Sequence, residues 1–204
     1  MAERRRLSPA LRRDQLIAAA LDVAAGRDFS AVSVQDIAQR AGVSEGLLYH
    51  YFPAKDALLI AAARSAADTM IRALDAALTG PPREALLAGL TAYLDHVQAQ
   101  PTGWRALLGA HTGELGDVAA GVEAHSRRLL LTALAVTRPS PTLTAVLDGW
   151  TAFERAACLS WLNEPGMQRA ALEDLLLSSF LGALEAAARH EPQIQALLGV
   201  LIAA

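Results

Sequence analysis

The sequence predicts an all-α fold, and three observations lead to this prediction. The 204 residues are 53% hydrophobic, with abundant alanine and leucine and few β-branched runs, which favours helices. Apolar residues recur at helical spacing along most of the chain. Proline and glycine clusters at 79–82, 139–141 and 163–166 divide the chain into segments of helical length. We expect ten helices.

The first helix begins at the Ser8-Pro9 pair, because a serine cap followed by proline at the first helical position is a typical helix start. It extends to about residue 25. Two short helices are expected within 33–52. The longer helices that follow are predicted over 55–78, 83–100, 103–111, 115–137, 142–162 and 168–190, with a last helix after Pro192.

The two short helices are joined by a glycine turn. Ser33 and Asp36 have the S-x-x-D spacing that opens a helix. Gly42 lies where this helix must end, since a tight turn needs a residue that tolerates positive φ. The segment therefore has the form of one helix, a sharp turn and a second helix.

The second short helix has one buried and one exposed side. Ser44 caps its start, and Leu48 and Phe52, four residues apart, give it an apolar side that packs on the protein. The residues between them stay near the exposed rim. This pattern is typical of a helix-turn-helix, whose second helix enters the major groove of DNA. Together with the first helix it predicts an N-terminal three-helix helix-turn-helix domain.

This part of the chain, about residues 16–59, resembles the DNA-binding domain of the TetR/AcrR family of bacterial transcriptional regulators. The residues that carry the resemblance are Ile37-Ala38, Ala41-Gly42-Val43-Ser44, Gly46, Leu48-Tyr49-His50-Tyr51-Phe52 and Lys55. The resemblance implies a helix-turn-helix domain over 1–58 and an all-helical ligand-binding and dimerisation domain over 59–204. Ala54 departs from the family, which often has a Ser or Asn cap there, and should weaken that cap by about 1 kcal/mol.

The residues expected to contact double-stranded DNA lie in and beside the helix-turn-helix. The hydroxyl and backbone N–H of Ser44 suit a phosphate at a helix N-terminus, and the resemblance implies backbone contacts for Tyr49 and Lys55. Leu47 and His50 are candidates for reading base edges. The complete predicted set is Ser33, Gln35, Ser44, Glu45, Gly46, Leu47, Tyr49, His50, Tyr51 and Lys55.

The charge distribution agrees with this placement. The net charge is −3, which would be unusual for a protein that only binds DNA. However, Arg4, Arg5, Arg6, Arg12 and Arg13 are concentrated near the N-terminus, whereas acidic residues outnumber basic ones beyond residue 60. The positive charge thus lies next to the helix-turn-helix, as expected for a DNA-binding surface.

The C-terminal part contains chemical groups without a motif. Polar and aromatic residues set among alanine and leucine are candidates for a largely apolar effector pocket. They are Tyr93, His96, Trp104, His111, Trp150, Phe153, Glu154 and Cys158. Taken singly, each is more often an ordinary core residue. Because few cationic residues occur in these helices, a neutral or cationic lipophilic ligand fits better than a polyanion.

The helices expected over 142–162 and 168–190 carry apolar faces too wide for one small monomer to bury. We therefore expect a homodimer formed through a four-helix bundle across a twofold axis. Its predicted contacts are Leu159, Leu162, Leu172, Leu176, Phe180, Ala183, Leu184 and Ala187. Two recognition helices related by a twofold axis imply a palindromic operator.

Other classes of protein find little support in the sequence. The single cysteine, Cys158, excludes an intramolecular disulfide and fits the cytoplasm. No uncharged apolar run approaches the ~18 residues of a membrane helix. The spacing of His96, His111 and His125 matches no metal-ligand pattern, and no catalytic or cofactor motif is present, which argues against an enzyme. The acidic body opposes a non-specific DNA-coating or membrane-associated role.

The sequence thus predicts a cytoplasmic regulator, with no metal or cofactor, that leaves its operator when a small, largely apolar ligand binds. Repression is the commoner behaviour in the resembled family. A ligand-dependent activator of the same fold remains the alternative.

Overall fold

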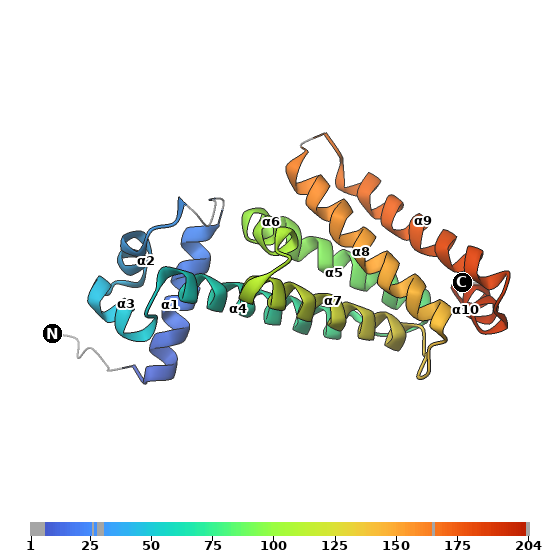
Figure 1. Cartoon of the computed structure of the whole chain (residues 1–204), viewed down its shortest axis with the longest axis horizontal. Coiled ribbons are helices and arrows are strands. Elements are labelled where there is room, and N and C mark those ends of the chain that lie inside the picture. Colours follow the sequence, from blue (N-terminus) through green and yellow to red (C-terminus); the bar gives the residue numbers. More distant parts are fainter. Residues whose placement is uncertain (1–6, 26, 28–30, 165, 203–204) are drawn as a thin grey trace.

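The computed structural model describes residues 7–25, 27, 31–164 and 166–202 (Figure 1). Within these ranges the chain forms ten α-helices and no strand. The helices are α1 (Pro9–Ala24), α2 (Val34–Ala41), α3 (Glu45–Tyr51), α4 (Lys55–Ala77), α5 (Pro82–Ala99), α6 (Pro101–Gly109), α7 (Gly113–Ala133), α8 (Pro141–Asn163), α9 (Arg169–Ala188) and α10 (Pro192–Ile202). The all-α prediction is confirmed.

The largest departure from the predicted bounds is the end of α7, at Ala133 rather than near residue 137. Ala135 adopts a left-handed conformation with φ of 55°, and the Val136 N–H donates to the Leu131 carbonyl at 2.9 Å. This is the hydrogen bond of a Schellman-type helix end. The sequence did not predict this helix end, because an alanine, unlike a glycine, does not indicate a residue with positive φ.

The N-terminal domain is built around one apolar cluster. Leu16 from α1, Ile37 from α2 and Leu48 from α3 are fully buried there, with Phe52 and Leu58 beside them. The short helices α2 and α3 expose most of their remaining residues. The cluster therefore fixes how α3 is presented to solvent.

The 23-residue helix α4 belongs to both parts of the molecule. Its first turns contribute Leu58 and Ala62 to the N-terminal cluster, whereas Met70 and Leu74 lie in the core of the C-terminal part. The predicted domain boundary at 58/59 falls inside this helix. Figure 1 shows α4 running from the N-terminal helices along the C-terminal domain.

The C-terminal domain has two apolar clusters. One joins α4 to α9 around residues such as Leu94, Trp104 and Leu176, and the other joins α8, α9 and α10 around Leu147 and Leu184. Helices α8 and α9 pack side by side, as Figure 1 shows. None of the helices in the described residues combines the length and apolarity needed to cross a bilayer.

Candidate DNA interface and effector pocket

The turn between α2 and α3 is held by side-chain caps and a glycine. The Ser33 hydroxyl accepts from the Asp36 N–H at 3.0 Å, which closes the first turn of α2. Gly42 ends α2 with φ of 66° and ψ of 35°, a left-handed conformation that few other residues tolerate. The Val43 N–H then donates to the Ala38 carbonyl at 3.0 Å. These contacts set the angle between α2 and α3.

Helix α3 is a seven-residue helix with a single fully buried side chain, Leu48. The Ser44 hydroxyl accepts from the Leu47 N–H at 3.2 Å. Of the predicted contacts on α3, Glu45, Gly46, Tyr49 and His50 are exposed, and Leu47 and Tyr51 are half-buried. The arrangement presents one polar and aromatic face to solvent, as a recognition helix must.

Two positions beside this face allow a close approach. A side-chain Cβ added at Gly46 would meet no protein atom within 4 Å, so the backbone of α3 is bare there. Lys55 is the first residue of α4, immediately after α3. Ser33 and Gln35 are also exposed, at the start of α2. All ten predicted DNA contacts therefore lie on or next to the exposed side of the helix-turn-helix.

The positive charge near α3 is partly neutralised. Arg40 forms a 2.6 Å ion pair with Asp22, and Arg27 lies 3.5 Å from Asp36. Arg13 stacks over the Phe52 ring at 4.3 Å. The predicted contribution of Arg4, Arg5 and Arg6 falls outside the described residues.

The C-terminal domain contains a partly open cavity of about 60 Å³ between α4, α5, α7, α8 and α9. Its walls are almost entirely apolar. The lining residues are Leu74, Leu78, Leu86, Gly89, Leu90, Tyr93, Ser126, Leu129, Leu130, Trp150, Glu154, Leu177 and Phe180. The Trp150 and Phe180 rings meet at 4.9 Å, and the Trp150 indole N–H donates to the Leu176 carbonyl at 3.0 Å.

Three neighbouring ionisable side chains, Tyr93, Glu154 and Cys158, lie at this apolar cavity, and the first two form part of its wall. Burial raises the pKa of Glu154 to about 8, and the nearby Glu123 adds to the effect. Burial, followed by the charge of Glu154, raises the pKa of Tyr93 and of Cys158 above their ordinary values, and the two side chains are hydrogen-bonded. At neutral pH all three groups are therefore predominantly protonated and neutral.

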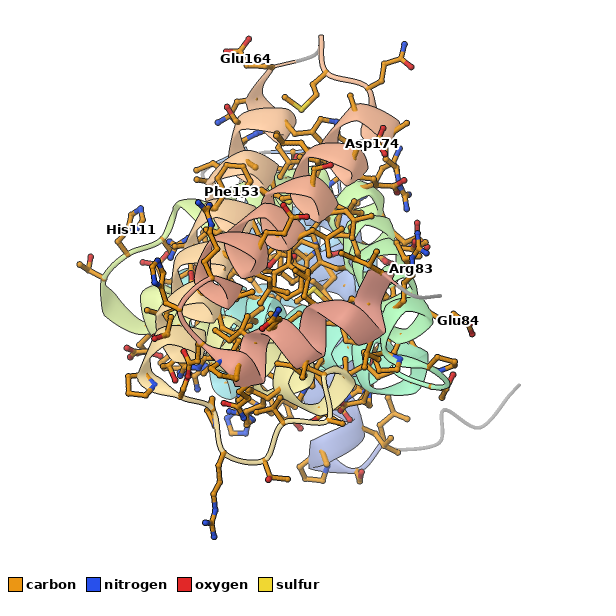
Figure 2. All side chains as sticks on the ribbon, turned by 90° about the vertical axis from the view of Figure 1, so that its right-hand side faces the viewer. Arg83, Glu84, His111, Phe153, Glu164 and Asp174 are labelled. Carbon is orange, nitrogen blue, oxygen red and sulfur yellow. The ribbon has the colours of Figure 1, made fainter. Side chains whose placement is uncertain are left out.

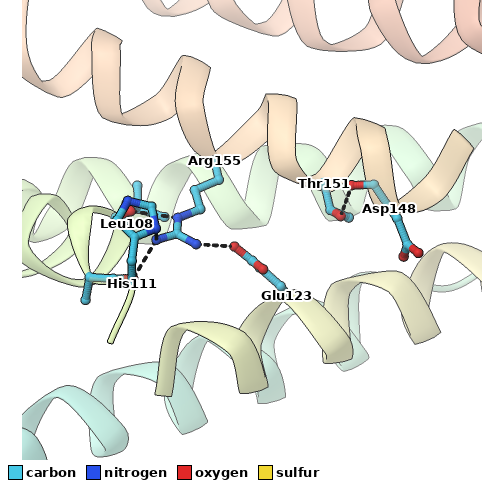
Figure 3. Close-up of polar contacts among 7 residues, drawn as sticks. Leu108, His111, Glu123, Asp148, Thr151 and Arg155 are labelled. Atoms are coloured by element: carbon cyan, nitrogen blue, oxygen red, sulfur yellow. Dashed lines mark hydrogen bonds and ion pairs between the residues drawn. The ribbon is translucent and has the colours of Figure 1, made fainter. Parts of the chain in front are cut away.

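Arg155, next to Glu154 in sequence, connects α8 to the end of α6 and to α7 (Figure 3). Its guanidinium donates to the Leu108 carbonyl at 2.7 Å, to the Ala110 carbonyl at 2.5 Å and to Glu123 at 2.7 Å. These hydrogen bonds hold the end of α6 against α8, the helix that carries Glu154.

The structure brings four of the eight predicted pocket residues together. Tyr93, Trp150 and Glu154 line the cavity, and Cys158 is buried against Tyr93. The other four candidates, His96, Trp104, His111 and Phe153, lie elsewhere.

His96 is absent from the cavity walls among the described residues, and its Nδ1 lies 3.0 Å from the Ala92 carbonyl of its own helix. His111 is exposed outside the helices, 3.1 Å from Arg155 (Figure 2). Phe153 is 39% exposed, because it lies on the outer side of α8. Trp104 is buried but lines two smaller neighbouring cavities.

The sequence did not reveal the aliphatic part of the pocket. Leu74 from α4, Leu129 from α7 and Leu177 from α9 look like any core leucine until the helices are assembled. Only their helical spacing was visible beforehand, and spacing alone does not show which stripes meet.

The predicted dimer contacts differ in how far they are exposed within one chain. Leu172, Leu176, Phe180 and Leu184 are at most 2% exposed inside their own chain, and Phe180 lines the cavity. Ala187 is buried as well, and Leu159, Leu162 and Ala183 are half-buried. Leu172, Leu176, Phe180 and Leu184 of α9 face the inside of their own chain.

The outer face of α8 and α9 consists mainly of small residues instead. They are Ala145, Gly149, Ala152 and Ala156 on α8 and Ser178, Gly182 and Ala186 on α9, all exposed. Two larger apolar residues, Phe153 and Leu175, are exposed at 39% and 42% on the same helices. We refer to these nine residues as the outer α8–α9 face.

The capped helix-turn-helix, with its exposed α3, defines a DNA-binding protein of the helix-turn-helix class. Comparisons with known proteins make the class specific. Residues 16–62 match the tetR family of bacterial regulatory proteins, and residues 82–183 match the tetracyclin repressor-like C-terminal domain. The chain belongs to the TetR family of transcriptional regulators, which are not enzymes.

Similar proteins agree with this assignment. The crystal structure of a tetR-family transcriptional regulator from Streptomyces coelicolor is 31% identical, with a TM-score of 0.88 over 97% of this chain and 90% of that one. The transcriptional activator FasR of Mycolicibacterium smegmatis is 34% identical over 96 residues, which are 46% of this chain and 44% of FasR. The regulator BetI of Rhizobium meliloti is 43% identical over 82 residues, or 38% and 39% of the two chains. The match thus spans less than half the length of these two curated relatives.

Proposed function

We propose that this protein is a bacterial repressor, acting in the cytoplasm, that leaves a palindromic operator when a small, largely apolar ligand enters the cavity. One observation carries the proposal: a single helix reaches both sites. Lys55 begins α4 beside the recognition helix, and Leu74 near its other end forms part of the cavity wall.

The size of the cavity supports coupling between ligand and DNA. A volume of about 60 Å³ accommodates only a few water molecules, since each needs roughly 10–15 Å³ by this measure. A larger ligand that enters this partly open cavity completely has to displace the walls, and α4 is one of them. Because α4 is continuous, such a displacement also moves its first turn and changes the placement of α3.

In the proposed docking, α3 lies in the major groove. Leu47 and His50 contact base edges, while Ser44, Tyr49 and Lys55 contact the phosphate backbone. Ser33, Gln35, Glu45, Gly46 and Tyr51 complete the contact surface. The exposure of α3 and the bare backbone at Gly46 support this geometry.

The proposed homodimer forms through the outer α8–α9 face. Its small residues allow close approach of two helix pairs, and Phe153 and Leu175 supply apolar area that water otherwise covers. A twofold axis through this face would relate two recognition helices, which requires half-sites separated by about one helical turn or a multiple of it.

The first experiment is selection of bound sequences from a random duplex DNA library at two salt concentrations. An inverted repeat that stays preferred as salt rises is the expected result. Affinity that collapses with salt and shows no enriched sequence would contradict the proposal.

Variants then separate the two kinds of contact. Lys55→Gln should weaken all sequences about equally, whereas Leu47→Ala should change the preferred bases. Arg72→Gln, which removes an exposed charge farther along α4, is the matched control and should do neither. Unchanged binding in both test variants would refute the docking geometry.

The similarity to FasR, whose name includes the word activator, favours one second candidate, a ligand-dependent activator. A reporter placed behind the selected operator distinguishes the two. Expression that rises when the regulator gene is deleted supports repression, and expression that falls supports activation.

A further inference from the structure

We propose that the cavity selects an amphiphilic cation, with an apolar body among the leucines and a protonated amine that donates a hydrogen bond to the Glu154 carboxylate. This inference rests on the proposed function, because it names the class of ligand for that same cavity. It follows from an acid that the protein buries without a partner.

Glu154 is 8% exposed and its side chain forms part of the cavity wall. Among the described residues its carboxyl group forms no hydrogen bond and no ion pair, and its oxygens are not sealed within the protein, because the side chain reaches the cavity. A buried polar group without a hydrogen bond destabilises the fold, and a buried unpaired charge does so more strongly. A donor supplied by a ligand would satisfy this group, and the rest of the cavity offers no comparable polar anchor.

The groups around Glu154 do not replace such a donor. Tyr93 from α5 is hydrogen-bonded to Cys158, one turn along α8 from Glu154. Glu123 from α7 brings a second negative charge and is paired with Arg155 at 2.7 Å. Arg155 is occupied by Glu123 and by backbone carbonyls of the α6 end.

The remaining helices contribute no charge to the cavity. Helix α4 and its C-cap contribute Leu74 and Leu78, and α9 contributes Leu177 and Phe180. An anionic head group would therefore meet the Glu154 carboxyl group and no cation among the described lining residues. A cation is attracted by the same carboxyl group, and the aromatic rings of the lining favour it further.

Three aromatic rings line the cavity together with Glu154. Trp150 and Phe180 form a tilted pair at 4.9 Å, and Tyr93 lies on the opposing α5. Aromatic faces attract cations with a strength that increases on desolvation. The leucines of α4 and α7 then accommodate an aliphatic or aromatic body.

Binding of a cation is linked to release of a proton. The pKa of Glu154, raised to about 8 by burial, keeps the empty site protonated at neutral pH, and pairing with an ammonium group favours the ionised form. An alkylamine stays protonated throughout, because its pKa is close to that of lysine, about 10.4. Affinity for the amine should therefore rise about tenfold per pH unit below pH 8 and then level off.

The test measures calorimetric binding of octylamine, 1-octanol and octanoate, which share one chain and differ in head group. Octylamine should bind at least about tenfold more tightly than either of the others at pH 7.5, a difference of about 1.4 kcal/mol. Its affinity should rise between pH 6 and 8, with close to one proton released per ligand in buffers of different ionisation heat. Octyltrimethylammonium, a cation without an N–H donor, should bind more weakly than octylamine.

Glu154→Gln is the test variant, because it keeps the size of the side chain and removes the charge. It should abolish the pH dependence and the preference for octylamine while leaving 1-octanol binding nearly unchanged. Glu164→Gln is the matched control, since this exposed acid lies at the far end of α8 (Figure 2). The control should behave as the wild type.

Equal binding of octylamine and 1-octanol, binding of none of the compounds, or an octylamine preference that survives Glu154→Gln would overturn the inference. The selected operator then tests the proposed function separately. If octylamine binds as expected but leaves operator affinity unchanged, the ligand class stands and the proposed effector role of the cavity fails.

Discussion

The DNA-binding helices and the effector cavity differ in how their residues are distributed along the chain. The predicted DNA contacts fall within 33–55, on two short helices and the start of a third. The cavity walls come from five helices between Leu74 and Phe180. Local spacing therefore determines the first site, whereas the second exists only after the helices have packed.

The two sites also differ in what they expose. Helix α3 presents polar and aromatic groups directly to solvent, and its partner is a large polyanion. The cavity hides a single acid, Glu154, in apolar surroundings. The contribution of charged side chains to folding stability should accordingly be small in the exposed DNA-binding region and large for the buried Glu154.

The largest predicted effect concerns this buried acid. Folding raises the pKa of Glu154 from its ordinary value of 4.5 to about 8, so between these values the folded state holds a proton that the unfolded state has lost. The contribution to stability is thus fully present below pH 4.5 and is lost as pH rises to 8. Relative to Glu154→Gln, the wild type should lose up to about 5 kcal/mol of unfolding free energy over this range.

Urea denaturation of both proteins at several pH values measures this difference. The exposed Glu164→Gln variant serves as control and should follow the wild-type curve. Parallel curves for wild type and Glu154→Gln would mean that the acid is solvated, and the contrast between the two regions would disappear.

The second prediction concerns the outer α8–α9 face. A Cβ added at Gly149 meets no atom of its own chain within 4 Å, so Gly149→Arg should fold as a monomer yet obstruct a second copy. Operator affinity should fall at least about 100-fold, or about 2.7 kcal/mol, because one recognition helix makes half the contacts. Sedimentation analysis and operator titration measure the two effects.

Gly121→Arg on α7 is the matched control, because its added Cβ also meets no atom within 4 Å. It should remain dimeric. A dimeric Gly149→Arg variant with full operator affinity would place the interface elsewhere.

The corrections at α8 and α9 show what the sequence could and could not reveal. The helices themselves, their breaks and the caps at Ser33 and Ser44 were predictable, because each depends on a few neighbouring residues. The sequence could not predict whether the wide apolar faces of α8 and α9 point into their own chain or toward a second copy. Phe180 was expected at a dimer interface but lines the cavity, since only packing decides which side of an apolar helix is covered.

The histidine candidates and Phe153 lie away from the cavity for a related reason. Tyr93 and Phe153 are equally good candidates in the sequence, because both are aromatic residues set among alanine and leucine. In the structure Tyr93 is buried at the cavity, whereas Phe153 is exposed. Glu154 was among the candidates because it is one of the polar residues set among alanine and leucine in the C-terminal part. Residue type indicated the chemistry, and assembly determined the location.

The third prediction sharpens the description of the DNA-binding region. The site of a Cβ at Gly46 is open in the free protein, so Gly46→Ala should fold at least as well as the wild type, with a gain in helix propensity. Against DNA, the methyl group would push α3 outward. Operator affinity should fall about tenfold, or about 1.4 kcal/mol, in a fluorescence anisotropy titration.

Gly121→Ala controls for the change in helix propensity and should leave operator affinity unchanged. If Gly46→Ala binds the operator normally, the backbone of α3 does not approach the DNA closely, and the docking geometry must be revised.

The smallest predicted effect lies at Ala54, the junction between the two regions. Ala54 occupies the N-cap of α4 in an extended conformation and makes no side-chain cap hydrogen bond. Ala54→Ser should supply one and stabilise the protein by about 0.5–1 kcal/mol. Ala76→Ser, an exposed position inside the same helix, should have the opposite sign because serine is the poorer helix former.

Thermal unfolding, monitored by calorimetry, then shows whether Ala54→Ser stabilises the N-terminal domain alone or both domains together. A single transition shifted upward is expected, because α4 contributes side chains to both the N-terminal and the C-terminal cores and so joins them into one cooperative unit. Two transitions, with only the first shifted by Ala54→Ser, would show that the domains unfold independently. In that case α4 would not be the rigid connection through which the cavity controls the recognition helix.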